Sequence, residues 1–119
     1  MSRYLVRQSQ VKPYSPANHS GTRNYRLIGP ETVGARQVEM ILGEIERGKG
    51  AHPHLHSGIE QVCYLLEGAA HVEVGEESFE MQAGEACFFP AGVMHVFTVT
   101  SERARLLVVY APPYLERPG

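Results

Sequence analysis

The 119-residue sequence predicts one antiparallel all-β domain, built as a sandwich or a barrel. Short segments in which apolar and polar residues alternate recur along the chain, and this is the period of half-buried strands. Turns rich in glycine and proline separate these segments, and no stretch keeps a 3.6-residue apolar period over three turns. About nine short strands joined in this way are typical of all-β domains.

The first 35 residues are expected to form an arm ahead of the main strands. Residues 4–11 mix apolar and polar side chains and suit an edge strand, and residues 24–28 suit a short strand. Residues 12–22, rich in Pro, Ser, Asn and Gly, are predicted to connect the two. Because His19 lies in this connector, we expect it to be a solvated surface histidine.

The segment 36–46 shows a clear alternation and is expected to be the first long strand. Met40 falls on its apolar parity, and Glu39 falls on the polar parity. Ile41 interrupts the polar parity, so the second face of the strand is expected to be covered as well. The Gly-Lys-Gly sequence at 48–50 is expected to close this strand with a turn.

The later strands are expected to follow one another as short runs bounded by glycine or proline. In one of these runs His71 falls on the polar parity, so the pleat predicts that it faces solvent. The predicted strands cover residues 61–66, 70–74, 79–82, 86–89, 95–100 and 105–111.

The composition excludes several classes of function. The formal charge is −2 and no basic stripe is present, which argues against nucleic acid as a partner. The longest apolar run, residues 106–111, is far too short to span a membrane. The N-terminal residues lack an apolar signal segment, so we expect a cytoplasmic protein. In that compartment Cys63 and Cys87 are expected to be free thiols packed in strands.

A cluster of histidines points to a metal site. His52, His54 and His56 alternate with other residues, so in extended backbone their side chains lie on one side. Imidazoles that converge in this way suit a transition metal such as Fe, Mn, Ni, Cu, Co or Zn, and the spacing alone does not choose among them.

Two blocks of the sequence resemble the signature motifs of the cupin family, which are small double-sheet jelly-roll barrels. The first block runs from Gly48 to Gly68 and contains His54, His56 and Gln61 at intervals of five, one, four and six intervening residues. The second block comprises Gly84, Pro90, Gly92 and His95, separated by five, one and two intervening residues. Val99 stands where the family usually closes this motif with Asn.

The resemblance covers about residues 36–111 and implies a jelly-roll barrel, a double-stranded β-helix, that forms a single domain over residues 1–119. It also implies one divalent transition metal ion held by the side chains that match the family's ligand positions. These are His54, His56, Gln61 and His95.

Two of the neighbouring residues compete for roles at this site. Counting back from Gly68 favours Gln61 over Glu60 as the fourth ligand, although the count forward from His56 permits either. Pro53 makes a regular strand doubtful, so His52 is expected at the rim of the site. The alternative to a metal centre is a barrel that has lost its metal and keeps its histidines hydrogen-bonded in a polar core.

The resemblance implies a small oxygenated ligand that chelates the metal inside the barrel. We expect one of two kinds of reaction at this metal. One is oxygen insertion, as in cupin dioxygenases, and the other is isomerase or lyase chemistry at an enolisable carbonyl. A non-catalytic binding or sensing module is the alternative. Possible general bases are Glu60, His52 and Tyr64, and the apolar wall is expected to include Met40, Cys63, Phe88, Met94 and Phe97.

Assembly into a homodimer is also expected, because related short cupins pair through their sheets or exchange N-terminal strands. The predicted edge strand at 4–11 would suit such an exchange.

Overall fold

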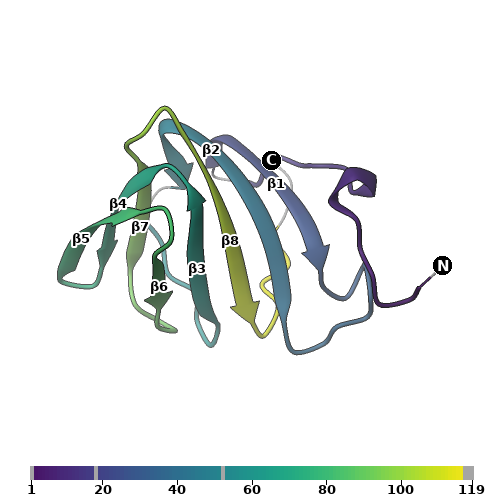
Figure 1. The fold of residues 1–119 in the computed structure, drawn as a ribbon. Coiled ribbons are helices and arrows are strands. Elements are labelled where there is room, and N and C mark those ends of the chain that lie inside the picture. The colour runs from purple at the N-terminus through teal and green to yellow at the C-terminus, as the bar shows by residue number, and fades with distance from the viewer. Residues whose placement is uncertain (1, 18, 52, 117–119) are drawn as a thin grey trace.

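The computed structural model describes residues 2–17, 19–51 and 53–116 (Figure 1). Within these residues it contains one short 3₁₀ helix, η1 (Gln8–Gln10), and eight strands. No helix of the described chain is long and apolar enough to cross a membrane. His52 lies outside the described residues. The strands are β1 (His19–Ile28), β2 (Glu39–Ala51), β3 (Glu60–Glu67), β4 (Ala69–Val74), β5 (Glu77–Gln82), β6 (Ala86–Phe89), β7 (His95–Val99) and β8 (Arg103–Ala111).

Two antiparallel sheets make up the barrel and confirm the predicted jelly-roll fold. The larger sheet has the strand order β1-β2-β8-β3-β6, and the smaller has the order β5-β4-β7. In Figure 1 the strands β2, β8 and β3 run side by side across the molecule, and β4, β5 and β7 lie at one end of it. The core therefore lies between the inner faces of the two sheets.

The alternation within β3 shows how the sequence creates an inside and an outside. Gln61, Cys63 and Leu65 are buried, whereas Val62 and Tyr64 are 44% exposed. The first three side chains point into the barrel because successive residues of a strand face opposite sides. Gln61 is thereby carried to the interior along with the apolar core.

The N-terminal region differs from the prediction. Residues 4–11 form no strand, and the first pairing of the chain is an isolated bridge between Tyr14 and Asn24. The predicted connector is only partly irregular, because β1 starts at His19 and pairs with β2 along its length. The sequence signal misled here since Ser, Asn and Gly weaken strand propensity, but pairing with a long neighbouring strand overrides it.

Strand β2 is longer than predicted. It continues through Gly48 and Gly50, both with positive φ, to Ala51 instead of turning at residues 48–50. The register with β1 shifts where Ser20 pairs with Gly50, which marks a bulge that absorbs the extra residues. Glu39, on the polar parity, is completely buried beside Ile41, so this second face of the strand is covered, as predicted.

Gly50 allows β2 to approach the smaller sheet closely. Its φ is +138°, and a Cβ there would lie 2.8 Å from the backbone oxygen of Phe97 on β7. Only glycine fits this conformation and this distance. The end of β2 thus reaches the strand that begins with His95.

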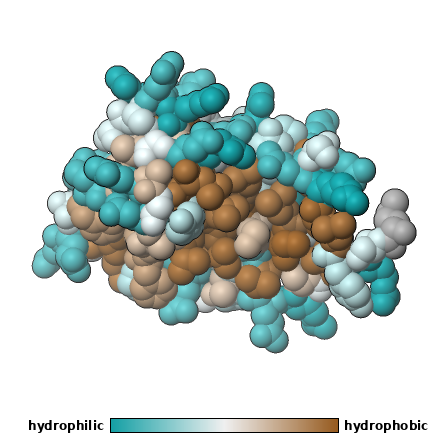
Figure 2. All heavy atoms as spheres, in the orientation of Figure 1, coloured by the Kyte–Doolittle hydropathy of each residue, from teal (hydrophilic) through white to brown (hydrophobic). Residues whose placement is uncertain are grey.

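The outer face of the larger sheet is apolar. Val62 pairs with Phe88 on one side and with Val109 on the other, and Tyr64 pairs with Leu107. Figure 2 shows a continuous hydrophobic area over the middle of the molecule, where β3, β8 and β2 run in Figure 1. We refer to these five residues as the outer apolar strip.

Candidate metal centre

Backbone hydrogen bonds join the two predicted motifs. His54 and His95 form an isolated antiparallel bridge, in which each backbone N–H donates to the other's carbonyl at 3.1 and 2.8 Å. The N–H of Gly92 donates to the carbonyl of His56 at 2.8 Å. These bonds fix the loop before β3 against the start of β7, and they bring residues 41 positions apart into one site.

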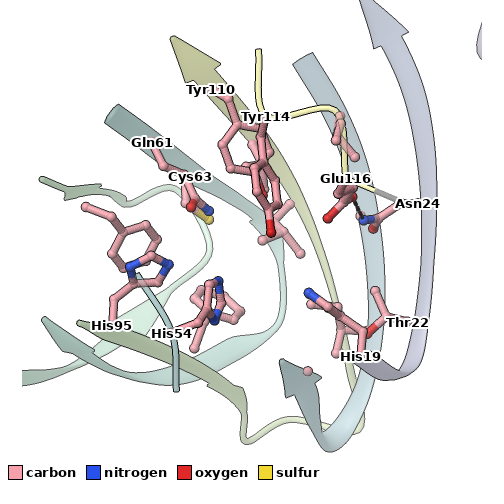
Figure 3. A pocket seen from close by; sticks show the side chains of 18 of the residues that line it. His19, Thr22, Asn24, His54, Gln61, Cys63, His95, Tyr110, Tyr114 and Glu116 are labelled. Atoms are coloured by element: carbon pink, nitrogen blue, oxygen red, sulfur yellow. Dashed lines mark hydrogen bonds between the residues drawn. The ribbon is translucent and has the colours of Figure 1, made fainter. Parts of the chain in front are cut away.

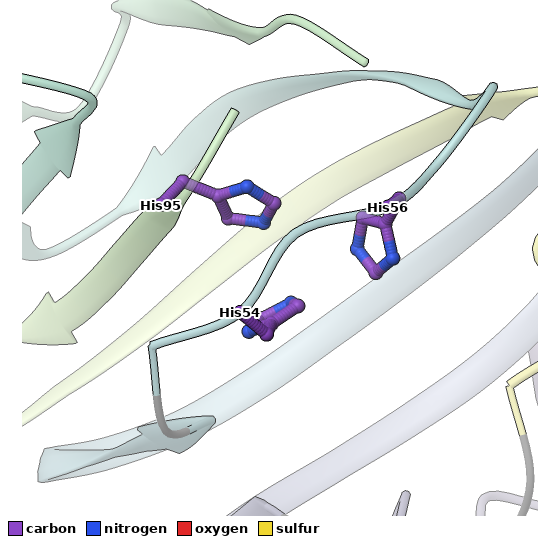
Figure 4. A group of neighbouring side chains, drawn as sticks. All are labelled: His54, His56 and His95. Carbon is purple, nitrogen blue, oxygen red and sulfur yellow. The ribbon is translucent and has the colours of Figure 1, made fainter. Parts of the chain in front are cut away.

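Three imidazoles meet where the motifs meet (Figure 4). One nitrogen from each of His54, His56 and His95 can be chosen so that all three lie within 4.8 Å of one another. The ring centroids are 4.8 Å apart for His54 and His56, 4.5 Å for His54 and His95, and 5.2 Å for His56 and His95. Three nitrogens on one side of an ion, with further positions open, is the donor arrangement of a catalytic metal site. The cluster could hold a metal ion.

Three buried polar atoms at the cluster lack hydrogen-bond partners in the described chain. Nε2 of His56, Nε2 of His95 and Oε1 of Gln61 are buried, and none has a hydrogen bond to the described chain. Buried polar atoms are costly unless something binds them, so these atoms fit a cation better than the hydrogen-bonded polar core of a metal-free barrel.

Gln61 and its neighbour Glu60 point to opposite sides of β3. Gln61 is 8% exposed and lines the same cavity as His54 and His95, whereas Glu60 is exposed. The pleat therefore brings the amide to the cluster and turns the carboxylate away from it. The predicted preference for Gln61 agrees with this placement.

Two histidines of the cluster, His56 and His95, are held neutral. Burial, followed by the nearby His54, lowers the pKa of both His56 and His95 from 6.5 to about 4. Neutral imidazoles are the form that binds a metal, so no proton has to be displaced near neutral pH.

The His95 ring is oriented by two contacts. It stacks on Phe89 with the ring centroids 4.3 Å apart, and its Nδ1 lies 3.3 Å from the carbonyl oxygen of Val93. An Nδ1–H that donates to this carbonyl leaves Nε2 with a lone pair, which is the tautomer a metal ligand needs.

The cluster lies at one end of a cavity of about 720 Å³ (Figure 3). His54, His95 and Gln61 lie on one side of the view, and Asn24, His19 and Glu116 lie on the other, with Tyr114 between them. Volumes of this size hold small organic ligands. Apolar side chains form much of the wall, namely Ile41, Ile45, Phe89, Phe97, Leu106 and Val108.

Several predicted members of the site prove to lie elsewhere. Cys63 and Phe97 line the cavity as predicted, but Phe88 and Met94 are 47% and 53% exposed, and Met40 is not among the lining residues. Phe89, the neighbour of Phe88, takes the inward position because the parity of the short strand β6 was misjudged.

The proposed general bases that can be placed also lie outside the cavity. Glu60 and Tyr64 are both on the outer side of β3. His71 faces solvent as predicted, and it contacts the carboxylate of Glu80 on the neighbouring strand β5.

The cysteines are free thiols in strands, as predicted. Cys63 on β3 pairs with Cys87 on β6. The Cys63 thiol donates a hydrogen bond to Cys87, and this bond together with burial raises the pKa of Cys63, so this cavity-lining sulfur is a weak nucleophile at neutral pH.

The prediction of His19 as a solvated surface residue was wrong. His19 lines the cavity, its ring centroid lies 6.5 Å from that of His54, and its Nδ1 is buried without a hydrogen bond to the described chain. Burial and the nearby His54 lower its pKa to about 4. Asn24, Tyr114 and Glu116 were missed altogether, and only the polar character of Asn24 and Glu116 could have signalled them.

Sequence comparison places the chain in a family. The profile of the cupin domain family matches residues 41–110, which is more than half of the chain. The chain is a cupin. The match spans both motifs and every strand from β3 to β7, so the three-histidine cluster lies within the family's own domain.

Individual relatives of this cupin come from several bacteria. Polyketide synthase CurC of Streptomyces cyaneus is 26% identical over 119 residues, which cover 100% of this chain and 77% of CurC. The polyketide cyclase RemF from Streptomyces resistomycificus has a similar structure, with a TM-score of 0.79, 26% identity, and coverage of 99% of this chain and 85% of RemF.

A structure described as an RmlC-like cupin from Shewanella frigidimarina has a TM-score of 0.82 at 20% identity and covers 96% of this chain and 95% of its own. At that identity the likeness supports the fold alone.

Proposed function

We propose that this cupin is a metal-dependent enzyme that closes rings in poly-β-ketone substrates. The donor cluster at the end of a large, mainly apolar cavity is the observation that carries the proposal. Similarity to CurC and RemF along nearly the whole chain, at 26% identity to each, supports the reaction class, since their names describe a polyketide synthase and a polyketide cyclase. The metal would be one divalent transition ion.

His54, His56 and His95 would hold the ion, with Gln61 as the fourth ligand. None of the four donor side chains can carry a negative charge, since three are imidazoles and one is an amide, so they would leave the full charge of the cation directed at the substrate. A divalent cation bound there would act as a Lewis acid, polarising a carbonyl oxygen and making the neighbouring C–H bonds more acidic.

The chain itself would supply the base and the shape. We assign His19 as the proton acceptor, because its imidazole is neutral, faces the cavity and lies beside His54. His19 would take a proton from a CH₂ group that lies between two carbonyls. The resulting carbanion would bond to the carbon of another carbonyl further along the same molecule. The oxygen of that attacked carbonyl would then take up a proton and become a hydroxyl. The ring closure needs no oxidant, and subsequent loss of water aromatises a ring without any other reagent.

Metal analysis followed by turnover measurements tests this proposal. We expect about one divalent transition metal per chain in the purified protein, with strong loss in His54→Ala or His95→Ala and no change in His71→Ala. Metal-loaded protein should consume poly-β-ketones long enough to close a six-membered ring, without using oxygen. His19→Gln should keep its metal but lose about 10²- to 10⁴-fold in turnover, which is the range for removal of a general base.

The alternative functions give different results in the same experiment. Oxygen consumption in step with substrate loss, seen with Fe(II), would mean a dioxygenase. Tight ligand binding with no turnover under any metal would mean a binding or sensing module. Unchanged metal content in both His54→Ala and His95→Ala would refute the site itself.

We also propose that the protein is a homodimer in which the outer apolar strip packs against its copy. Residues 4–11 form no strand, so the strip is a better candidate than exchange of an N-terminal strand. A sheet face with paired, exposed Val62, Tyr64 and Phe88 is more apolar than a solvent-facing sheet needs to be, and such patches commonly mark protein interfaces.

A further inference from the structure

The cavity has a second polar end, opposite the metal cluster (Figure 3). There the carboxylate of Glu116 accepts two short hydrogen bonds on Oε1, from the Tyr14 hydroxyl and from Asn24 Nδ2, both at 2.6 Å. Glu116 and Asn24 also line the cavity wall. Residues from β1 and from the chain after β8 therefore form a polar group here. The proposed metal binding and proton transfer give this group no role.

The segment that carries Glu116 is anchored by buried charges. The N–H groups of Tyr114 and Leu115 both donate to Glu39 Oε1 at 3.1 Å. Arg26 pairs with Glu39 at 3.1 Å and donates to the backbone oxygen of Glu116 at 2.6 Å. Because Glu39 is completely buried, this anchor holds the C-terminal segment across the cavity.

One oxygen of Glu116 has no partner. The residue is 8% exposed, both hydrogen bonds fall on Oε1, and Oε2 makes none within the described part of the chain. Tyr14 stays a donor, since burial and the neighbouring Glu116 raise the pKa of its hydroxyl well above the usual range. This carboxylate oxygen therefore remains available, beside the cavity, as an acceptor for a donor from a ligand.

The charge at this end is negative. Glu116 and Glu39 carry two negative charges, and Arg26 supplies one positive charge, so one negative charge remains uncompensated at the wall. Arg26 also contacts the Tyr14 hydroxyl and the exposed Glu31, and neither of these adds positive charge. A ligand group with its own negative charge is therefore disfavoured here, whereas a neutral hydroxyl is favoured.

We propose that Oε2 of Glu116 accepts a hydrogen bond from a neutral hydroxyl at the far end of the substrate. The cavity would then select molecules that carry a chelating β-diketone at one end and a phenol or enol hydroxyl at the other, and it would reject those that end in a carboxylate. This inference deepens the proposed function, because it takes the metal end to hold the diketone. Glu116 is a specificity-determining residue in this scheme.

The test compares three ligands on metal-loaded protein by titration calorimetry: benzoylacetone, its para-hydroxy derivative and its para-carboxy derivative. The hydroxy derivative should bind most tightly and the carboxy derivative most weakly. Benzoylacetone has no para substituent, so its binding reports on the diketone end alone. This binding should disappear when the metal is removed. The matching para-substituted acetophenones, which cannot chelate, should keep the same ranking, so a failure of the proposed metal chemistry can be told apart from a failure at Glu116.

The variant Glu116→Gln keeps the size of the side chain but replaces the free acceptor with a donor. It should weaken binding of the hydroxy derivative by about 10- to 100-fold, which is the usual effect of losing a hydrogen bond to a charged group. It should also tighten binding of the carboxy derivative, and it should change benzoylacetone little. Glu31→Gln removes an exposed carboxylate from the same ion pair network and should leave the ranking unchanged.

Two results would overturn the proposal. One is equal affinity of the unaltered protein for the hydroxy and unsubstituted ligands, a measurement that needs no variant to fold. The other is an equal loss for all three ligands in Glu116→Gln, which would mean that Glu116 only supports the structure.

Discussion

At the scale of single residues, the lowered histidine pKa values make a prediction about the metal-free protein. The pKa of His19, His56 and His95 lies near 4 in the folded chain, against an ordinary value of 6.5. Between these two values the unfolded chain binds more protons than the folded chain does. Since stability rises with pH wherever the unfolded state holds more protons, the free energy of unfolding should fall as the pH drops from 7 to 5.

This effect can be measured by calorimetry in the presence of a chelator. Solvent screening in the cavity reduces the full effect of the pKa shifts. We therefore expect Tm to fall by about 4–8 °C between pH 7 and pH 5, the change that roughly 1 kcal/mol produces in a small domain. Stability should be level between pH 7 and pH 8.

A matched pair of variants assigns the effect to the site. His95→Gln should flatten the decline in Tm because it removes one buried imidazole. His71→Gln should not, since Glu80 raises the pKa of His71 and shifts its contribution in the opposite direction. A Tm that stays constant from pH 7 to pH 5 in the metal-free protein would contradict the proposed burial of neutral histidines.

At the scale of elements, the glycines between strands decide how closely the strands meet. Gly68 joins β3 to β4 with a φ of +92°, and a Cβ there would collide with the backbone oxygen of Arg103 and lie 2.6 Å from Ser101 Oγ. Gly84 has nearly the same φ of +91° but has no atom within 4 Å of its Cβ position. Comparing Gly68 with Gly84 therefore separates the cost of a positive φ, which both share, from the cost of a steric clash, which only Gly68 has.

Alanine substitution at the two positions should therefore have unequal effects. Gly84→Ala should cost about 1–2 kcal/mol of stability, which is the strain of a left-handed residue. Gly68→Ala should lose about 1–3 kcal/mol more, because the β3–β4 connection must move away from the start of β8. Urea denaturation of metal-loaded protein measures both values. Equal losses would show that the chain at Arg103 moves aside easily.

The elements also show which parts of the structure could be read from the sequence. The three-histidine cluster was anticipated because two blocks of the sequence resemble the family's motifs. That resemblance implied the set His54, His56, Gln61 and His95. Gln61 faces inward because of strand pleating, whereas the sequence favoured it over Glu60 only through the count back from Gly68.

His19 and Glu116 could not be placed, because their positions depend on contacts between distant parts of the chain. His19 faces the cavity only because β1 pairs with β2, and Glu116 does so only because Glu39 and Arg26 hold the C-terminal segment. Glu39 was placed only on the polar parity of its strand, and nothing local in the sequence names its partners. Its buried partners come from residue 26 and from residues beyond 113, which no local pattern connects to it.

At the scale of the whole molecule, the two faces of the larger sheet differ in what they present. The inner face of the larger sheet supplies Gln61 and much of the cavity wall, and its outer face presents the outer apolar strip (Figure 2). Packing of two copies through this strip would brace the same strands that carry the site. Assembly and metal binding would then stabilise each other, as any event that favours the folded state does.

Light scattering tests this arrangement. The unaltered protein should have twice the chain mass of 13.2 kDa, and Tyr64→Glu should be monomeric, because a charge in the centre of the strip would have to be buried without a partner. Met94→Glu is the matched control, since Met94 is 53% exposed and lies outside the strip, and this variant should remain dimeric. A monomer at high concentration of the unaltered protein would rule the interface out. A dimer that persists in Tyr64→Glu would move it to another face of the barrel.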